Sequence, residues 1–183
     1  MVAFSLGDEL QGVIREDRAA SKLQQEVAQL FEEAREDVYR YVLSLGVHPP
    51  QAQEAAQEAF LRLYATLRKG EKIENPRAYV FRVAHNLGLK TRAKQNVQEA
   101  FDPGLEQQII GREPSPEHTL LEKERWLQFH RAMSGLSEQQ RRCLDLRLEG
   151  LRYPEIGAIL GISASAVGEF LRRALVRLKK SCD

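Results

Sequence analysis

The chain has 183 residues, of which 43% are hydrophobic, 29% are charged and only 7% are aromatic, and its formal net charge is +1. This composition supports a packed core and suits solvated helices better than a β-sandwich. No apolar run reaches the roughly 18–20 residues that a membrane span requires. No basic flank precedes an apolar stretch at the N-terminus, so we expect neither membrane insertion nor an export signal.

The small net charge hides an uneven distribution along the chain. The net charge is −6 over residues 1–61, +7 over 62–94, −4 over 95–138 and +4 over 139–183. Two basic blocks separated by an acidic stretch indicate two surfaces that face nucleic acid, with acidic surface left for other partners. Most basic stripes on helices are merely solvated, so the charge pattern alone does not establish nucleic-acid binding.

The sequence offers no constellation of residues for catalysis or metal binding. Cys143 and Cys182 stand apart, without a CxxC pair or a histidine at metal-ligand spacing. Unpaired cysteines fit a reducing cytoplasm. There is also no phosphate-binding glycine loop, no nucleophile elbow and no pair of catalytic carboxylates. We therefore expect no metal, no cofactor and no enzymatic activity.

The first predicted helix begins at Lys22, after residues 1–21. These residues have no strong period and are interpreted as an N-terminal tail, in which a short helix is expected near Asp8 to Glu16. Apolar residues recur from there at steps of three and four, which places them on one helical face. Gly46 and the following His48-Pro49-Pro50 end the helix. The apolar face consists of Leu23, Val27, Leu30, Phe31, Ala34, Val38, Tyr41, Val42 and Leu45.

Two further helices complete an N-terminal domain over residues 22–95. One runs from Pro50 or Gln51 to Arg68 and is rich in alanine, which allows close packing. The next begins at Asn75-Pro76, with Asn75 as N-cap and Pro76 at the first helical position, and ends near Gln95. The predicted inward residues are Ala52, Ala56, Ala59, Phe60, Leu63 and Leu67 on the former and Val80, Val83, Ala84 and Leu87 on the latter.

A proline- and glycine-containing stretch over residues 96–116 is interpreted as a flexible linker. Helices resume over 117–133 and again after Ser137, where Ser137 and Gln140 form a capping box. Three short helices are expected at 138–149, 154–160 and 164–180, within a C-terminal domain over 117–183. With no strand candidate, the fold class is all-α: a bundle of three helices or more, a linker and a second helical domain.

The C-terminal domain carries the most specific local pattern. A short helix ends at Gly161, Ser163 caps a longer one, and Gly157 leaves room for the two helices to cross. Val167 then fixes the second helix against the first, as in a helix-turn-helix. An ordinary helical hairpin in a bundle is the alternative interpretation, and the spacing of Gly157, Gly161 and Val167 favours DNA binding.

Three segments resemble one protein family. Residues 136–180, LSEQQRRCLDLRLEGLRYPEIGAILGISASAVGEFLRRALVRLKK, resemble the C-terminal region of extracytoplasmic-function sigma factors, which reads the upstream promoter element. A similar helix-turn-helix occurs in response-regulator output domains. Residues 51–64, QAQEAAQEAFLRLY, are similar to the sigma segment that docks on the polymerase clamp helices. Residues 75–92, NPRAYVFRVAHNLGLKTR, resemble the segment that opens promoter DNA, and the order of the three favours the sigma family.

The resemblance implies three sets of site residues. Polymerase docking is expected at the outer face of the second helix, and the displaced promoter strand at an outward stripe of the third, where an aromatic ring and cations suit stacked bases and phosphates. The loop over 68–74 would help to select a flipped base, and the recognition helix would read the upstream element. The docking residues are Glu54, Gln57, Glu58 and Leu61, and the strand-binding residues are Arg77, Tyr79, Arg82, Asn86 and Lys90. The residues expected to contact the upstream element are Ser163, Ser165, Ala166, Glu169, Arg172 and Arg173.

The recognition helix departs most from the family pattern. Threonine and basic or hydroxyl residues are usual around Val167, whereas this chain has Ala166, Gly168, Glu169 and Phe170. A glutamate repels phosphate, although it can accept a hydrogen bond from cytosine N4 in the major groove. Gly168 lowers helix stability by about 1 kcal/mol relative to alanine.

The function implied by the resemblance is that of a sigma factor, which binds bacterial core RNA polymerase and directs promoter-specific initiation. Promoter DNA is the second implied partner, and an anti-sigma factor is compatible with the sequence. The implied location is the bacterial cytoplasm, with nucleoid association in the holoenzyme. The alternative is a free-standing helix-turn-helix regulator, which would need a dimerisation surface in place of the docking and strand-holding segments.

Overall fold

The structure is a computed structural model that describes residues 6–101 and 133–182, with side chains over 21–97 and 133–179. These ranges contain helices and no strand, which confirms the all-α prediction. Most of the predicted helix over 117–133 and most of the predicted linker lie outside the described residues. The helices are α1 (Leu6–Ser44), α2 (Pro49–Arg68), α3 (Pro76–Phe101), α5 (Glu138–Leu148), α6 (Tyr153–Leu160) and α7 (Ala164–Cys182).

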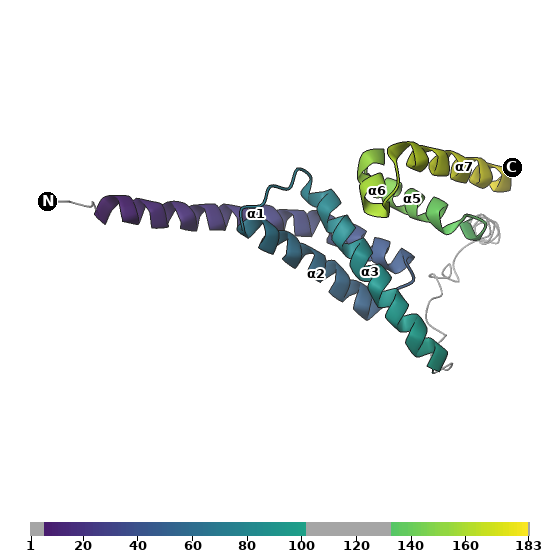
Figure 1. The fold of residues 1–183 in the computed structure, drawn as a ribbon, viewed down its shortest axis with the longest axis horizontal. Helices are drawn as coiled ribbons and strands as arrows, with labels where there is room; N and C mark the ends of the chain where they lie inside the picture. The colour runs from purple at the N-terminus through teal and green to yellow at the C-terminus, as the bar shows by residue number, and fades with distance from the viewer. Residues whose placement is uncertain (1–5, 102–132, 183) are drawn as a thin grey trace, which may run out of the picture.

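Helix α1 begins at Leu6, well before the expected start at Lys22, so the N-terminal stretch interpreted as a tail is helical from that residue onwards. The stretch contains no proline, and extending an existing helix needs no new nucleation. The first turns of α1 project beyond the other two helices of the N-terminal bundle (Figure 1). At its other end, Gly46 adopts φ +83° and ends the helix as predicted.

The N-terminal bundle forms because α1, α2 and α3 each bury an apolar face. The predicted alanine-rich face of α2 is buried from Ala52 to Leu63, and α1 contributes Ala34, Val38 and Val42. Phe31 of α1 meets Phe60 of α2 edge to face, with ring centroids 5.1 Å apart. These contacts confirm the predicted inner faces.

Helix α3 differs from the prediction in two respects. It continues to Phe101, six residues past the expected end at Gln95, because no proline interrupts it before Pro103. It is also buried on a wider arc than the predicted stripe, because Phe81 and His85 are buried beside Val80 and Ala84. Asn75 caps the helix as predicted, with its Oδ1 accepting from the Ala78 N–H at 3.0 Å.

The C-terminal helices form the predicted helix-turn-helix. The Ser137–Gln140 capping box opens α5, Gly161 turns the chain at φ 69°, and Val167 is fully buried between the helices. A methyl group on Gly157 would lie 2.6 Å from the Ile162 carbonyl oxygen, so α6 and the turn can approach this closely only at a glycine.

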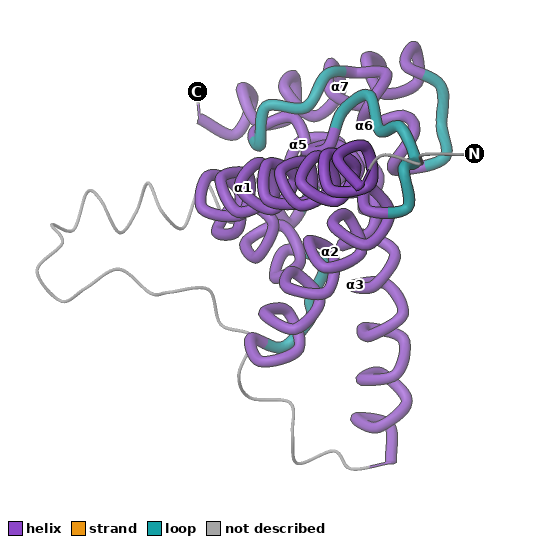
Figure 2. Tube along the Cα trace, turned by 90° about the vertical axis from the view of Figure 1, so that its left-hand side faces the viewer, coloured by secondary structure: helices purple, strands orange, loops and turns teal. Residues whose placement is uncertain are grey.

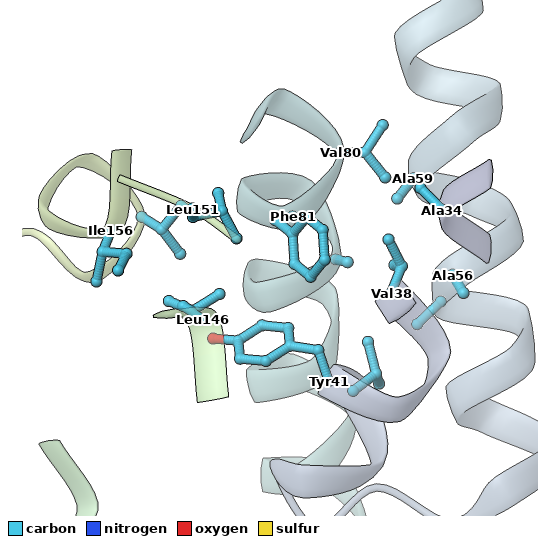
Figure 3. Close-up of a cluster of buried hydrophobic side chains, with 14 of the residues drawn as sticks. Ala34, Val38, Tyr41, Ala56, Ala59, Val80, Phe81, Leu146, Leu151 and Ile156 are labelled. Carbon is cyan, nitrogen blue, oxygen red and sulfur yellow. The ribbon is translucent and has the colours of Figure 1, made fainter. Parts of the chain in front are cut away.

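The two groups of helices lie against each other. Helices α5–α7 gather on one side of the α1–α3 bundle (Figures 1 and 2). Leu146 and Leu151 of this group lie beside Tyr41 and Phe81 of the bundle, and Ile156 lies behind Leu151 (Figure 3). All five side chains are at most 2% exposed, so the contact buries a continuous apolar seam.

Candidate polymerase and DNA interfaces

The predicted docking residues lie together on the outer face of α2. Glu54 and Gln57 are exposed, and the Leu61 side chain between them and the end of the helix is 56% exposed. Glu58 is partly buried and accepts a hydrogen bond from Arg62 Nε at 2.7 Å. The face is therefore polar and acidic around one apolar side chain.

A shallow hollow of about 490 Å³ extends this face onto α3. Besides the predicted residues, Leu87 and Thr91 line it. Leu87 was predicted to face the core and is only partly buried, and Thr91 was not predicted. Their spacing of four residues puts both on one side of α3. That side lies at the hollow because of the way α2 and α3 cross, which the sequence does not reveal.

Three of the five predicted strand-binding residues form one exposed stripe on α3. Arg82, Asn86 and Lys90 are exposed and follow one another at helical steps of four. Tyr79 is half-buried at the start of this stripe, where its hydroxyl shares a 3.0 Å hydrogen bond with Thr66 Oγ1. The Arg82 guanidinium lies 5.4 Å from the Tyr79 ring centroid, so one face of the ring is covered by a cation.

The fifth predicted residue, Arg77, lies elsewhere. Its Nη2 donates to Asp37 Oδ2 of α1 at 2.6 Å and to the Glu149 carbonyl oxygen at 3.1 Å. Its guanidinium also lies 5.4 Å from the Phe81 ring centroid. Arg77 therefore faces α1 and the C-terminal helices rather than the stripe.

A second hollow, of about 670 Å³, opens between the loop before α3 and helix α6. The loop contributes Lys72 and Asn75, α3 contributes Tyr79 and Arg82, and α6 contributes Glu155 among others. The loop over 68–74, to which base selection was assigned, thus forms one wall, and the C-terminal helices form the opposite one. The sequence analysis contains no signal for this second wall.

On the recognition helix α7, the predicted cap is present, because Ser163 Oγ accepts from the Ala166 N–H at 3.1 Å. Ser165 is exposed and Ala166 is partly buried. Glu169 accepts hydrogen bonds from Arg172 at 2.9 Å and from Arg173 at 2.7 Å. These arginines lower the pKa of Glu169 to about 2. The basic side chains of the helix are thus partly neutralised by its own carboxylate.

Two carboxyl groups on α5 and at its end lie at the seam between the two groups of helices. Burial raises the pKa of Asp145, and it also raises that of Glu149, with the Asp37 carboxylate as a second cause. Both groups belong to the C-terminal helices, and Glu149 lies 3.7 Å from Arg40 of α1.

Within the described ranges, no three histidine, cysteine, aspartate or glutamate side chains are placed to hold a metal ion. Nor does any helix in that part of the chain combine the length and apolar character that crossing a bilayer demands.

Comparison with known proteins matches both groups of helices. Residues 30–97 match the sigma-70 region 2 family and residues 126–178 the sigma-70 region 4 family. The extracytoplasmic-function (ECF) RNA polymerase sigma factor SigM of Bacillus subtilis is 27% identical over 158 residues, which cover 84% of this chain and 93% of SigM. Ferric citrate uptake sigma factor FecI of Escherichia coli is 27% identical over 125 residues, which cover 68% of this chain and 72% of FecI.

A solved structure shows the same fold. Sigma factor RpoE of Bartonella quintana, crystallised with the anti-sigma factor NepR, aligns with a TM-score of 0.65 at 19% identity, over 86% of this chain and 97% of RpoE. The order of the two matched regions is the order predicted from the sequence motifs. The chain therefore belongs to the sigma-70 family of RNA polymerase sigma factors and is of the extracytoplasmic-function type.

Proposed function

We propose that this sigma factor divides its work among three surfaces: the outer face of α2, the exposed stripe of α3 and the recognition helix α7. As a sigma factor, the chain binds core RNA polymerase and directs promoter-specific initiation, and it is an initiation factor rather than an enzyme. The observation that carries this conclusion is the match to region 2 and region 4 in one chain, in that order.

The α2 face is the proposed polymerase-docking surface. It presents acidic and amide groups around the exposed Leu61, beside a hollow completed by Leu87. Such a face suits a partner that is basic at its rim and apolar at its centre. The rival interpretation, a free-standing helix-turn-helix regulator, is not favoured, because it gives no role to the region 2 match over residues 30–97.

The α3 stripe is the proposed site for the displaced promoter strand. Arg82 and Lys90 supply cations for the phosphates, and the half-buried Tyr79 supplies a ring that is already held by Thr66. Asn86 lies between the two cations and offers an amide to an unpaired base edge. Arg77 joins this set only when its contacts to Asp37 and Glu149 are released.

The recognition helix is the proposed reader of the upstream element, through Ser163, Ser165, Ala166, Glu169, Arg172 and Arg173. We further propose that an anti-sigma protein restrains the chain, because sigma factor RpoE of Bartonella quintana, which has the same fold, was crystallised with the anti-sigma factor NepR. The proposed location is the bacterial cytoplasm, with nucleoid association in the holoenzyme.

The experiment that tests the function combines two measurements. Purified chain is mixed with core polymerase and passed over a sizing column, and the mixture is then used to transcribe genomic DNA. We expect co-elution and transcripts with defined start sites that depend on the chain. Core polymerase that elutes alone, or transcripts unchanged by the chain, would refute the proposal.

A further inference from the structure

The N-terminal half of the recognition helix is completed by a side chain from the neighbouring helix. Helices α6 and α7 pack side by side (Figures 1 and 2). Gly168 of α7 has no side chain, and the Tyr153 ring of α6 lies in the space beside it. A Cβ atom added at Gly168 would lie 3.5 Å from Cε2 and 3.7 Å from Cδ2 of that ring. A side chain longer than alanine at this position would therefore compete with the ring for the same space.

The Tyr153 ring is held in place but is not buried. The Arg147 guanidinium carbon lies 5.7 Å from the ring centroid, and Arg147 Nη1 donates to the Leu151 carbonyl oxygen at 3.0 Å. The cation is thus fixed over one face of the ring. Tyr153 is also the first residue of α6 and is followed by Pro154, which restricts the backbone. The residue is nevertheless 42% exposed, so a positioned aromatic surface faces solvent.

The position of Gly168 puts this aromatic surface on a side of α7 that is open to DNA. Val167 and Leu171 are buried and define the inner side of the helix. Gly168 lies one turn before the exposed Arg172, so both lie on the same flank of α7. In a helix-turn-helix, the N-terminal part of the recognition helix contacts base edges in the major groove. Tyr153 therefore extends the proposed reading surface, although it belongs to α6.

The chemistry of the aromatic surface selects one feature of the major groove. Ring carbon atoms form no strong hydrogen bonds, and Gly168 adds no polar side chain. The C5-methyl group of thymine is the apolar group that base pairs present in the major groove, and apolar side chains contact it. The charged groups of α7 begin only at Glu169, which accepts from Arg172 and Arg173. The N-terminal end of the reading surface thus suits a thymine, and hydrogen bonding to bases falls to the residues that follow.

We propose that Tyr153 is a further specificity-determining residue of this sigma factor, and that its ring contacts the methyl group of a thymine in the upstream promoter element. Gly168 leaves room for the ring, and Arg147 positions it. The inference rests on the proposed role of α7 and deepens it by naming a base that the surface prefers. The Tyr153 hydroxyl offers a different contact, a hydrogen bond to a phosphate, which has no preference for a base and is distinguished by removing the hydroxyl alone.

Uracil in place of thymine removes only the methyl group and keeps the base pairing, so it tests the contact directly. The affinity of the holoenzyme is measured for a promoter duplex taken from a start site that the chain specifies, with each thymine of the upstream element replaced in turn. We expect one replacement to weaken binding by about fourfold, the equivalent of one buried methyl group. Unchanged affinity at every position would overturn the proposal.

Variants of Tyr153 show whether this side chain contacts the methyl group. Tyr153→Phe keeps the ring and should keep the uracil effect, whereas Tyr153→Ala should bind the thymine and uracil duplexes equally. Arg173→Ala is the matched control, because it weakens the same surface elsewhere and should keep the uracil effect. A uracil effect that survives in Tyr153→Ala would overturn the proposal. An equal loss of affinity for every duplex in Tyr153→Phe, with no uracil effect, would mean a phosphate contact and would likewise overturn it.

Gly168 provides a second test that leaves Tyr153 unchanged. Gly168→Ala adds a methyl group 3.5 Å from the ring, an ordinary contact distance, and should keep the uracil effect. Gly168→Gln suits a helix nearly as well but needs the space of the ring, so it should abolish the effect. Circular dichroism checks that every variant is helical. Equal uracil effects in the two Gly168 variants would overturn the proposed arrangement.

The same assay separates failure of this inference from failure of the proposed function. Scrambling the whole upstream element should weaken binding if the recognition helix reads it. Unchanged affinity on scrambling would refute the proposed role of α7, and the thymine contact with it. A loss of affinity on scrambling without a uracil effect at any position would refute the thymine contact alone.

Discussion

At the scale of single residues, His85 of the N-terminal bundle has a strongly perturbed pKa. Burial, aided by the nearby Arg142 cation, lowers its pKa from 6.5 to about 4. Nδ1 of the ring lies 2.8 Å from the Tyr41 hydroxyl and accepts from it when the neutral ring carries its proton on Nε2. Protonation of Nδ1 reverses this hydrogen bond and leaves a cation in a buried position near Arg142, so the folded chain favours the neutral imidazole.

This geometry predicts a pH dependence of stability. Because the pKa of His85 is lower in the folded state than in the unfolded state, its contribution to the free energy of unfolding is fully present above pH 6.5. This contribution is lost as the pH falls towards 4. Between these values the free energy of unfolding should decrease by up to about 1.4 kcal/mol per pH unit from this one group. Denaturant titrations of the parent chain and of His85→Gln, whose amide can still accept from Tyr41, isolate the effect. Equal slopes in the two proteins would contradict it. Asp145 and Glu149 titrate with the opposite sign but are common to both.

Glu169 is the second informative residue. Because it holds both Arg172 and Arg173, Glu169→Gln should weaken that hold and strengthen binding to duplex DNA of arbitrary sequence, with a steeper dependence on salt. Each additional phosphate contact adds about 0.9 to the log–log slope. The full chains are titrated with a promoter duplex and a scrambled duplex at two salt concentrations. A loss confined to the promoter would mean that the carboxylate reads a base, and no change in either would mean that α7 does not contact DNA.

At the scale of elements, the outer face of α2 carries the docking prediction. Replacing Glu54 and Glu58 by lysine and Gln57 by alanine should weaken core-polymerase binding by about 2–5 kcal/mol, the usual cost of removing charged partners from a desolvated contact. Binding is measured by competition, and helicity by circular dichroism. Arg62→Ala is the matched control, since it removes only the partner of Glu58. Wild-type affinity in the triple variant would exclude this face.

The exposed stripe of α3 carries the melting prediction. Arg82→Ala and Asn86→Ala alter side chains that lie outside the core, so the double variant should fold and bind polymerase normally but form less open complex. In comparable single-strand sites each stacked base contributes about 1–3 kcal/mol to binding, and cations such as Arg82 offset the negative charge of the strand. Permanganate reactivity of unpaired thymines is compared on duplex and pre-melted templates. Rescue on the pre-melted template points to nucleation of melting, whereas normal opening on duplex DNA would leave the stripe a solvated helix face.

Most elements could be predicted because their signals are local. The apolar period of α2, the Asn75-Pro76 start of α3 and the Ser137 capping box each depend on neighbouring residues, and the structure confirms them. The early start of α1 at Leu6 was not predicted, because residues 1–21 show no strong apolar period that would mark a continuous helix. Within the site, the stripe of α3 followed from helical spacing. The diversion of Arg77 did not, because Asp37 and Glu149 lie 40 and 72 residues away in sequence.

At the scale of the whole molecule, the two groups of helices meet along one apolar seam. At the edge of this seam, Arg40 of α1 lies 3.7 Å from the Glu149 carboxylate, and Arg77 of α3 donates to the Glu149 carbonyl oxygen at 3.1 Å. The N-terminal and C-terminal helices are therefore joined by polar as well as apolar contacts.

The polar contacts at the edge of the seam also have a consequence for inheritance. Arg40 lies far from Glu149 in sequence, and Asn75 lies far from Glu155, but their side chains meet across the seam, so a substitution of one partner changes the selective value of the other. Descendants of this chain should exchange such residues in compensating pairs, with the two halves of the gene diverging in step. A hybrid gene could join residues 1–101 to the C-terminal half of a distant relative. The residues that meet across the seam in its product would not have evolved together.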